Sequence, residues 1–289
     1  MQTLARLTQR FNHAFPWHQP KTGLVKRVAR KMDRAGGPSV VDGIAGSLRM
    51  KLDMASDYEL AIAMNSYEMV IVSIIRRLLK PGDTFVDGGA NLGVLSLIGA
   101  KLVGPTGKVV AFEPQPAALE RLRENLALNP GLTNIELIDQ GVWHEPGGFT
   151  MYHFEDDGID GVSMGKRSDK AVAQEIAIKT TRIDAVVDGP VKLIKLDVEG
   201  AELAALQGAS GLLQEGAMPH VIAELKGITA QAFGYDPIEV VDFLNGVHKP
   251  GFGLTLLKTR RAVPMTYDQL KQVLVDEPKK TLNVHFAPR

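Results

Sequence analysis

The order of hydrophobic and polar residues between residues 84 and 225 alternates between two patterns. Short, continuously apolar runs that end at charged or turn residues are typical of buried parallel strands. Between them lie longer segments with apolar residues three and four positions apart, the spacing of amphipathic helices. This alternation indicates an α/β protein with a mostly parallel sheet and helices on both faces. The predicted strands are 84–87, 108–113, 135–139, 191–198 and 220–225, and the predicted helices are 91–103, 116–129 and 201–215.

The residues on either side of 84–225 continue the alternation of strands and helices less regularly. Ser66 is suited to cap a helix over residues 66–79. The closing residues predict a strand, a helix and a strand, which we expect to form an antiparallel edge of the sheet. The further predicted strands are 149–154, 175–181, 252–257 and 282–286, and the further predicted helices are 237–246 and 267–276.

Residues 1–65 are predicted to be an N-terminal extension that packs on a main domain of residues 66–289. The extension contains two short amphipathic helices before residue 36 and a half-buried strand at 48–54. Residues 1–40 contain eight basic residues and one acidic residue, so their net charge is +7 (8 − 1) and that of the remainder is −7. Such a segment could contact a membrane surface or an acidic protein, or could form a solvated helix face.

Composition narrows the class of protein. The chain has 289 residues, of which 45% are hydrophobic, enough for a sizeable core. It contains no cysteine, which excludes disulfides, cysteine-bound zinc and a thiol nucleophile. We expect no secretion signal and no transmembrane segment, and therefore a cytoplasmic protein. The acidic main body offers no basic groove, so we expect no nucleic-acid partner.

The densest motif is Phe-Val-Asp-Gly-Gly-Ala-Asn-Leu-Gly at residues 85–93, an apolar strand followed by a glycine-rich turn and a helix start. Glycines let the backbone approach a ligand, and the helix start offers free N–H groups. The glycine spacing alone fits a dinucleotide site nearly as well as a site for S-adenosyl-L-methionine (SAM). Asp87 at the strand tip favours SAM, because a carboxylate suits its cationic amino group and would repel a pyrophosphate.

The next two strands also end in acidic residues. Glu113 ends the second strand, where an acid can accept both hydroxyls of a ribose. Asp139 and Gln140 end the third strand and are predicted to lie near the adenine, against which Val142 or Trp143 could pack. Capping or loop acids are the structural alternative for these positions.

A second motif covers residues 191–202, where charged residues interrupt an apolar strand. Lys195 and Asp197 lie on the same side of this strand, and buried charges need partners. We expect Lys195 to pair with Glu224 on the neighbouring strand, which leaves Asp197 at the strand tip near the cofactor. A purely structural ion-pair network is the alternative.

Taken together, these motifs resemble the FkbM family of SAM-dependent methyltransferases. The resemblance covers residues 66–226 in order and at family-like spacing. It rests on Tyr67-Glu68, residues 85–93, Phe112-Glu113-Pro114 and residues 193–202. Gly88 departs from the family, which often has a larger apolar residue there, and the residues after the third strand are less typical.

The resemblance implies a Rossmann-like class I methyltransferase fold, with a mostly parallel seven-stranded sheet and helices on both faces. It implies O-methylation of a hydroxyl on a sugar or another small molecule. Glu68 would lie near the amino group of SAM and Glu113 at its ribose, while Asp197 and Glu199 would form the floor of the acceptor site. Asp87 and Gly89 would line the methionine part of SAM, and the other predicted cofactor-binding residues of the same turn are Asn91, Leu92 and Gly93.

Methyl transfer to an alcohol needs a base to remove the hydroxyl proton. The candidates are Asp197, Glu199 and His144, of which histidine has the most suitable unperturbed pKa. A divalent metal is an alternative means of acidifying the hydroxyl, with Asp197 then a ligand. The acidic loop at 155–161 resembles a metal site only in composition, through Asp156, Asp157 and Asp160.

Two other functions remain compatible with the sequence. An NAD(P)-dependent oxidoreductase could use the same glycine-rich turn, but it would not require Asp87 or the block at 197–202. A non-catalytic SAM-binding scaffold could use the basic N-terminus as its partner surface. Substitution of Asp197 separates the scaffold from the methyltransferase, because it would abolish turnover in the enzyme and leave partner binding intact in a scaffold.

Overall fold

The computed structural model describes residues 37–154, 162–163, 165, 171–213, 218–258 and 261–289. The two amphipathic helices and the basic segment predicted before residue 36 lie outside the described residues, as does the acidic loop at 155–161. In the part of the chain that the structure describes, no helix is both long enough and apolar enough to cross a membrane.

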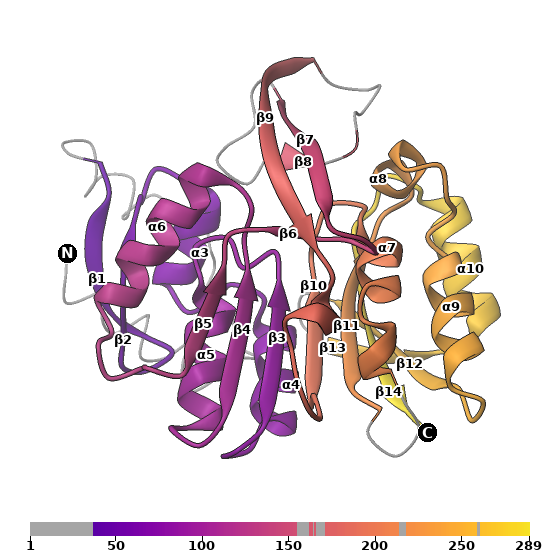
Figure 1. Cartoon of the computed structure of the whole chain (residues 1–289), viewed down its shortest axis with the longest axis horizontal. Coiled ribbons are helices and arrows are strands. Elements are labelled where there is room, and N and C mark those ends of the chain that lie inside the picture. The colour runs from indigo at the N-terminus through magenta and orange to yellow at the C-terminus, as the bar shows by residue number, and fades with distance from the viewer. Residues whose placement is uncertain (1–36, 155–161, 164, 166–170, 214–217, 259–260) are drawn as a thin grey trace.

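The centre of the molecule is an eight-stranded mixed sheet with the order β13-β12-β14-β11-β10-β3-β4-β5 (Figure 1). Six strands run in one direction, and β13 and β14 run in the other. This confirms the predicted Rossmann-like α/β fold, with one strand more than expected. The strands are β3 (Thr84–Gly88), β4 (Lys108–Phe112), β5 (Ile135–Ile138), β10 (Leu193–Leu196), β11 (His220–Leu225), β12 (Phe252–Lys258), β13 (Arg261–Met265) and β14 (Leu282–Pro288).

The C-terminal strands confirm the predicted antiparallel pairing and add one strand. β14 lies between β11 and β12 and pairs antiparallel with both, and the outermost strand is β13. The sequence did not predict β13 because this strand is short, is largely exposed and contains Pro264. Proline is tolerated in a strand mainly at a sheet edge, where its missing N–H faces no partner.

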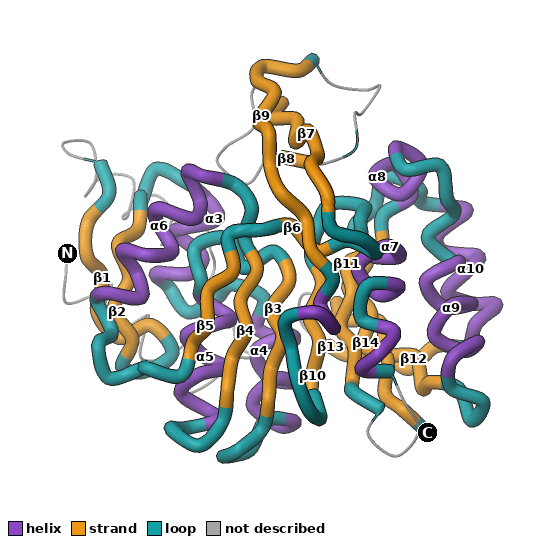
Figure 2. Tube along the Cα trace, in the orientation of Figure 1, coloured by secondary structure: helices purple, strands orange, loops and turns teal. Residues whose placement is uncertain are grey.

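Helices cover both faces of the sheet (Figure 2). One face packs against α4 (Met69–Leu78), α5 (Val94–Val103) and α6 (Pro116–Ala127) through a core that includes Phe85, Val109 and Leu193. The other face packs against α7 (Glu202–Gln207), α9 (Glu239–Val247) and α10 (Tyr267–Asp276). The sheet is therefore buried on both sides, and ligands have access only at its edges.

The strand order reverses between β3 and β10. After β3 the chain builds β4 and β5 on one side, and then crosses to place β10 on the other side of β3. Loops leaving β3 and β10 therefore diverge at the carboxyl ends of these strands. In open α/β sheets this position is the usual ligand crevice.

The described part of the N-terminal extension is a hairpin of β1 (Ser39–Ile44) and β2 (Leu48–Leu52) followed by α3 (Asp57–Ala63). The strand predicted at 48–54 is β2, in which alternate residues are buried. The hairpin and α3 pack beside α6: the backbone N–H of Lys51 donates to Asn125 Oδ1 over 2.7 Å, and Arg121 pairs with Glu59 of α3 at 2.6 Å. Further polar contacts to α5 and a hydrophobic core shared with α4 and α5 also hold the hairpin in place.

The predicted cap of the helix at 66–79 is wrong. Ser66 donates its hydroxyl to the carbonyl of Ala61, at the end of α3, so it cannot cap the next helix. Helix α4 begins instead at Met69, after Glu68 in a left-handed backbone conformation (φ 38°). The sharp turn directs the side chain of Glu68 toward the carboxyl edge of the sheet.

A small four-stranded sheet rises above that edge (Figure 1). Its longest strands pair antiparallel and confirm the strands predicted at 149–154 and 175–181. The sheet has the order β6-β9-β7-β8, with β6 (Gly141–Val142), β7 (Gly147–Phe154), β8 (Val162–Ser163) and β9 (Val172–Thr181). The remaining elements are α8 (Gly227–Ala232) and two 3-10 turns, Ile183–Ala185 and Ser210–Leu212.

Candidate functional site

The glycine-rich turn after β3 packs directly against the tip of β10. Gly89 has a φ of 75°, and a Cβ at this position would collide with the carbonyl oxygen of Asp197. Both its backbone conformation and its surroundings therefore require glycine. This contact brings the two sequence motifs together at the reversal of strand order.

Asp87 lies at the floor of this turn and is fully buried. Its Oδ2 accepts a hydrogen bond from Ser96 Oγ over 2.5 Å, and its Oδ1 lies 3.6 Å from Lys195 Nζ. Burial raises the pKa of Asp87, and the ammonium of Lys195 and the bond from Ser96 partly oppose this rise. The ammonium of Lys195 already lies beside Asp87. The carboxylate of Asp87 therefore balances that charge and is not available to a ligand alone.

The predicted partner of Lys195 is wrong. Its Nζ lies 3.6 Å from carboxylate oxygens of both Asp87 and Asp197, and it donates to the carbonyl of Gly89 over 3.1 Å. Strand register explains the difference, because Lys195 is level with Asp87 on β3 and with Ile222 on β11. Burial alone would lower the pKa of Lys195, but the surrounding carboxylates outweigh it and raise the pKa, so the side chain is charged.

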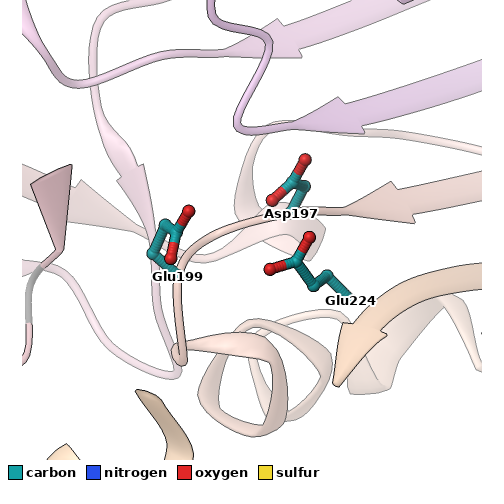
Figure 3. A group of neighbouring side chains, drawn as sticks. All are labelled: Asp197, Glu199 and Glu224. Carbon is teal, nitrogen blue, oxygen red and sulfur yellow. The ribbon is translucent and has the colours of Figure 1, made fainter. Parts of the chain in front are cut away.

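Glu224, freed from that pairing, joins Asp197 and Glu199 in an acidic cluster (Figure 3). One carboxylate oxygen of each residue lies within 4.8 Å of the others, and the three side chains come from the ends of β10 and β11 and the loop after β10. Burial, followed by the charges of Asp197 and Glu199, raises the pKa of Glu224 well above its usual value. Such a cluster can accept a proton, and its oxygen atoms are also of the type that Mg²⁺ and Ca²⁺ prefer.

The loop that presents Asp197 and Glu199 is held by two residues whose role the sequence did not reveal. Glu199 adopts φ 51°, a conformation rarely populated by a non-glycine residue. The buried Glu202 Oε1 accepts from the backbone N–H groups of Val198 (3.1 Å) and Gly200 (3.3 Å). Tyr235 Oη donates to the carbonyl of Gly200 over 2.9 Å. Glu202 and Tyr235 thus hold the loop in place without lining the crevice themselves.

Glu113 is buried at the end of β4, with 6% of its surface exposed. Its two oxygens accept from the backbone N–H groups of Asn91 (2.8 Å) and Gln115 (2.9 Å). Burial raises its pKa to about 7 despite these two bonds. Glu113 therefore braces the glycine-rich turn, and each oxygen retains a lone pair for a further donor.

Three buried side-chain oxygens at the site have no hydrogen-bond partner among the described residues. One is Asp87 Oδ1, which faces the ammonium of Lys195; the other two are Glu68 Oε2 and Asn91 Oδ1, both on residues with left-handed backbone. Burial, and next the charge of Asp197, raises the pKa of Glu68 to about 7. Buried polar groups without partners are costly, so these atoms are suited to bind donors of a ligand.

These residues surround a central cavity of about 240 Å³. It continues into a small cavity of about 60 Å³ beneath β7, and Gly89, Glu113 and Asp197 line both. The central cavity has six carboxylates and one ammonium in its lining, so a cationic ligand fits its charge. The charged residues of the central cavity are Glu68, Asp87, Glu113, Lys195, Asp197, Glu199 and Glu224. The small cavity is also lined by Phe112, Pro114, Gln140, Val142, Met151 and Ser163.

Four predicted site residues lie outside both cavities. Leu92 is fully buried in the core, and Gly93 packs against the side chain of Leu122 at the start of α5. Both follow the turn that forms the cavity wall, and they face the helix layer rather than the cavity. They support the turn from behind.

The other two are on the surface. The side chain of Asp139 is 64% exposed and lies 3.7 Å from Arg123, so of the pair predicted at the adenine only Gln140 lines a cavity. The side chain of His144 is 43% exposed, lies 3.8 Å from Glu145 and contacts the ring of Trp143. Trp143 itself packs between Phe149 and Phe233. The position of His144 gives no support to its predicted role as base.

Comparison with known proteins finds similarity to methyltransferases. Methyltransferase sdnD of Sordaria araneosa is 30% identical over 159 residues, a match that covers 44% of this chain and 61% of the relative. Hexuronic acid methyltransferase AglP of Haloferax volcanii is 31% identical over 179 residues, which is 60% of this chain and 66% of the relative. Both matches therefore span less than two thirds of the relative's own length.

A solved structure and a family profile complete the comparison. The FkbM methyltransferase of Methylobacillus flagellatus has a TM-score of 0.45 and 17% identity, over 80% of this chain and 55% of that chain. The profile described as the methyltransferase FkbM domain matches residues 87–252, more than half of the chain. This range contains the glycine-rich turn, the second motif and the acidic cluster. The chain belongs to the FkbM family of methyltransferases.

Proposed function

We propose that this methyltransferase uses SAM to methylate a hydroxyl group on a small-molecule or carbohydrate acceptor. The main support is the central cavity at the reversal of strand order, where carboxylates outnumber the single ammonium and a cationic cofactor would balance the charge. The similarity to a hexuronic acid methyltransferase, at 31% identity, supports a carbohydrate acceptor. When bound, SAM supplies a methyl group on a positively charged sulfur.

The cavity residues suggest how the cofactor would be held. Glu113 has a free lone pair on each oxygen and would accept the ribose hydroxyls. Val142 and Met151 line the small cavity and would enclose the adenine. Glu68, whose Oε2 is unpartnered, would accept from the amino group of the methionine part. Asn91 Oδ1 would accept from the same group.

The acidic cluster would serve the acceptor. In methyl transfer the hydroxyl oxygen attacks the methyl carbon, the carbon–sulfur bond breaks, and the hydroxyl proton must go to a base. Asp197, Glu199 or Glu224 would take that proton, because all three line the cavity and His144 does not. Much of the rate would come from holding the hydroxyl against the methyl carbon.

The same three carboxylates are the group that could bind a divalent cation instead. The ammonium of Lys195 lies 3.6 Å from Asp197 and already supplies a positive charge there. We therefore propose that no metal is required. Treatment with EDTA would leave turnover unchanged, whereas a loss that Mg²⁺ or Ca²⁺ restores would favour the metal mechanism.

Isothermal titration calorimetry with SAM, its demethylated product S-adenosylhomocysteine (SAH) and NAD⁺ tests the cofactor. SAM and SAH should bind and NAD⁺ should not. Glu113→Ala should weaken SAM binding by at least about tenfold, the loss expected for one or two charge-assisted hydrogen bonds. Glu120→Ala, a substitution of an exposed glutamate on the neighbouring helix α6, is the matched control.

Binding of NAD⁺ alone would support an oxidoreductase. SAM binding that survives Asp197→Ala without any turnover in the parent protein would support a scaffold.

A further inference from the structure

A third cavity lies beside the central one, at the carboxyl edge of the C-terminal half of the sheet. Its volume is about 430 Å³, larger than that of the central cavity and within the range typical of small-molecule sites. It lies between the start of α4, the end of β12 and the start of β14. The residues of this third cavity are Ser66, Glu68, Met69, Val70, Ile71, Leu256, Leu257, Lys258, Lys280, Thr281, Leu282 and Asn283.

The third cavity adjoins the acidic cluster. Glu68 lines both the central and the third cavity. On the sheet, Asn283 of β14 is in register with Glu224 on β11 and with Leu257 on β12. Opposed residues in an antiparallel pair point to the same face, so Asn283 continues the surface that begins at Glu224. A ligand in the third cavity would therefore lie next to the proposed proton acceptors.

The two cavities differ in charge. The central cavity has six carboxylates and one ammonium, whereas the third cavity has two ammonium groups and the single carboxylate of Glu68. Lys258 has no ion pair among the described residues. Lys280 pairs with Glu277 over 2.7 Å, but both side chains are about half exposed. Such a pair contributes little to stability, so Lys280 can leave Glu277 to bind a ligand. Two lysines at one cavity are suited to an anionic ligand.

We propose that the third cavity binds the acceptor, and that the acceptor has a carboxylate or phosphate group which Lys258 and Lys280 bind. This inference rests on the proposed methyl transfer to a hydroxyl. The lysines would hold the anionic end at the rim, and Asn283 and Ser66 offer polar contacts to hydroxyls. The target hydroxyl would then lie toward Glu68 and Glu224, where the central cavity begins.

The test is calorimetric titration of the SAH-bound full-length protein with three sugars that differ only at carbon 6. These are glucuronate with a carboxylate, glucose 6-phosphate with a phosphate ester, and glucose with neither. At least one anionic sugar should bind at least about tenfold more tightly than glucose, the effect expected for one charge-assisted contact. The two anionic sugars also distinguish a carboxylate acceptor from a phosphate acceptor.

Variants locate the binding. The double variant Lys258→Ala/Lys280→Ala should lower the affinity for the anionic sugar about tenfold. Lys279→Ala, an exposed neighbour outside the cavity, should not. SAH affinity should be the same in all variants, which also shows that they fold.

Three results would overturn the inference. They are equal or tighter binding of glucose, absence of binding by both anionic sugars at millimolar concentration, and anion binding that the double variant leaves unchanged. Failure of the parent protein to bind SAH is a different result, which contradicts the proposed function itself.

Discussion

The two halves of the carboxyl edge differ in how their chemistry is fixed. At the β3–β4–β10 half, side chains are buried and bonded to backbone: Glu113 to two N–H groups, and Lys195 to the carbonyl of Gly89. At the β11–β14–β12 half, the charged residues Lys258 and Lys280 are exposed. The buried, hydrogen-bonded side chains of the first half can hold one ligand in one pose. The exposed residues of the second half can be substituted without disturbing the fold. We interpret the first as the cofactor half and the second as the acceptor half.

The largest expected effect comes from breaking the contact at the centre of the cofactor half. Gly89→Ala would place a methyl group against the carbonyl of Asp197 at a positive φ. We expect a loss of at least about 2 kcal/mol in the free energy of unfolding, from backbone strain and overpacking, and loss of SAM binding. Urea denaturation and calorimetry measure both.

Gly246→Ala is the control for that substitution. Gly246 is exposed in α9 with nothing near its missing Cβ, so alanine should stabilise the protein by about 0.5–1 kcal/mol. Equal effects of the two substitutions would show that the turn tolerates a side chain, and the tight packing of the two motifs would then not matter for binding.

A smaller effect is expected where the acidic loop is held from below. Tyr235→Phe removes the donor to the carbonyl of Gly200 and should cost about 1 kcal/mol of stability. Displacement of Asp197 and Glu199 should lower kcat by between about tenfold and a hundredfold, because small misplacements at a reacting centre are costly. The affinity for SAH should change little. A variant with unchanged kcat would contradict a positioning role for Tyr235.

The cofactor half should also respond to pH. Burial raises the pKa of Glu68 to about 7, and the amino group of SAM needs the ionised carboxylate. SAM affinity should therefore rise on the order of tenfold between about pH 5.5 and pH 7. Calorimetry at several pH values measures this rise, and Glu68→Gln should flatten it. A pH-independent affinity in the parent protein would exclude Glu68 from the amino-group site.

The ligand-free protein should show the opposite trend in stability. Burial raises the pKa of Glu113 and Glu202, as well as Glu68, to about 7. Between the unfolded value near 4.5 and about 7, the folded chain holds more protons than the unfolded chain. The free energy of unfolding should therefore fall as pH rises through this window. Thermal denaturation across the window measures it, and a stability that rises with pH would contradict the assigned burial.

The smallest effect is expected outside the cavities. His144→Ala and Asp139→Asn should each change stability by no more than about 0.5 kcal/mol and leave turnover nearly unchanged, because both side chains are exposed. Loss of turnover in His144→Ala would restore the histidine as the base and would place part of the acceptor site at Trp143.

The difference between the two halves of the carboxyl edge also explains which features could be predicted from the sequence. The turn at 87–93 and Glu113 were recognisable because a local pattern, a strand tip followed by glycines or a helix, specifies their position. Asp139 has a similar local pattern, but the side chain points to solvent, and only the three-dimensional structure shows this.

Long-range pairing could not be predicted. Which carboxylate meets Lys195 depends on register between β10 and its two neighbours, and the place of β14 inside the sheet depends on a crossover that no local pattern encodes. For the same reason the third cavity left no motif, because its residues come from α4 and the turn before it, from β12, and from β14 and the loop before it.

A crystal structure of the protein with SAH tests the central claim most directly. The account predicts the ribose hydroxyls within hydrogen-bond distance of Glu113, the adenine against Val142 and Met151, and the amino group at Glu68, with the third cavity free of the cofactor. SAH bound in the third cavity, or with its ribose away from Glu113, would contradict the division of the carboxyl edge into a cofactor half and an acceptor half.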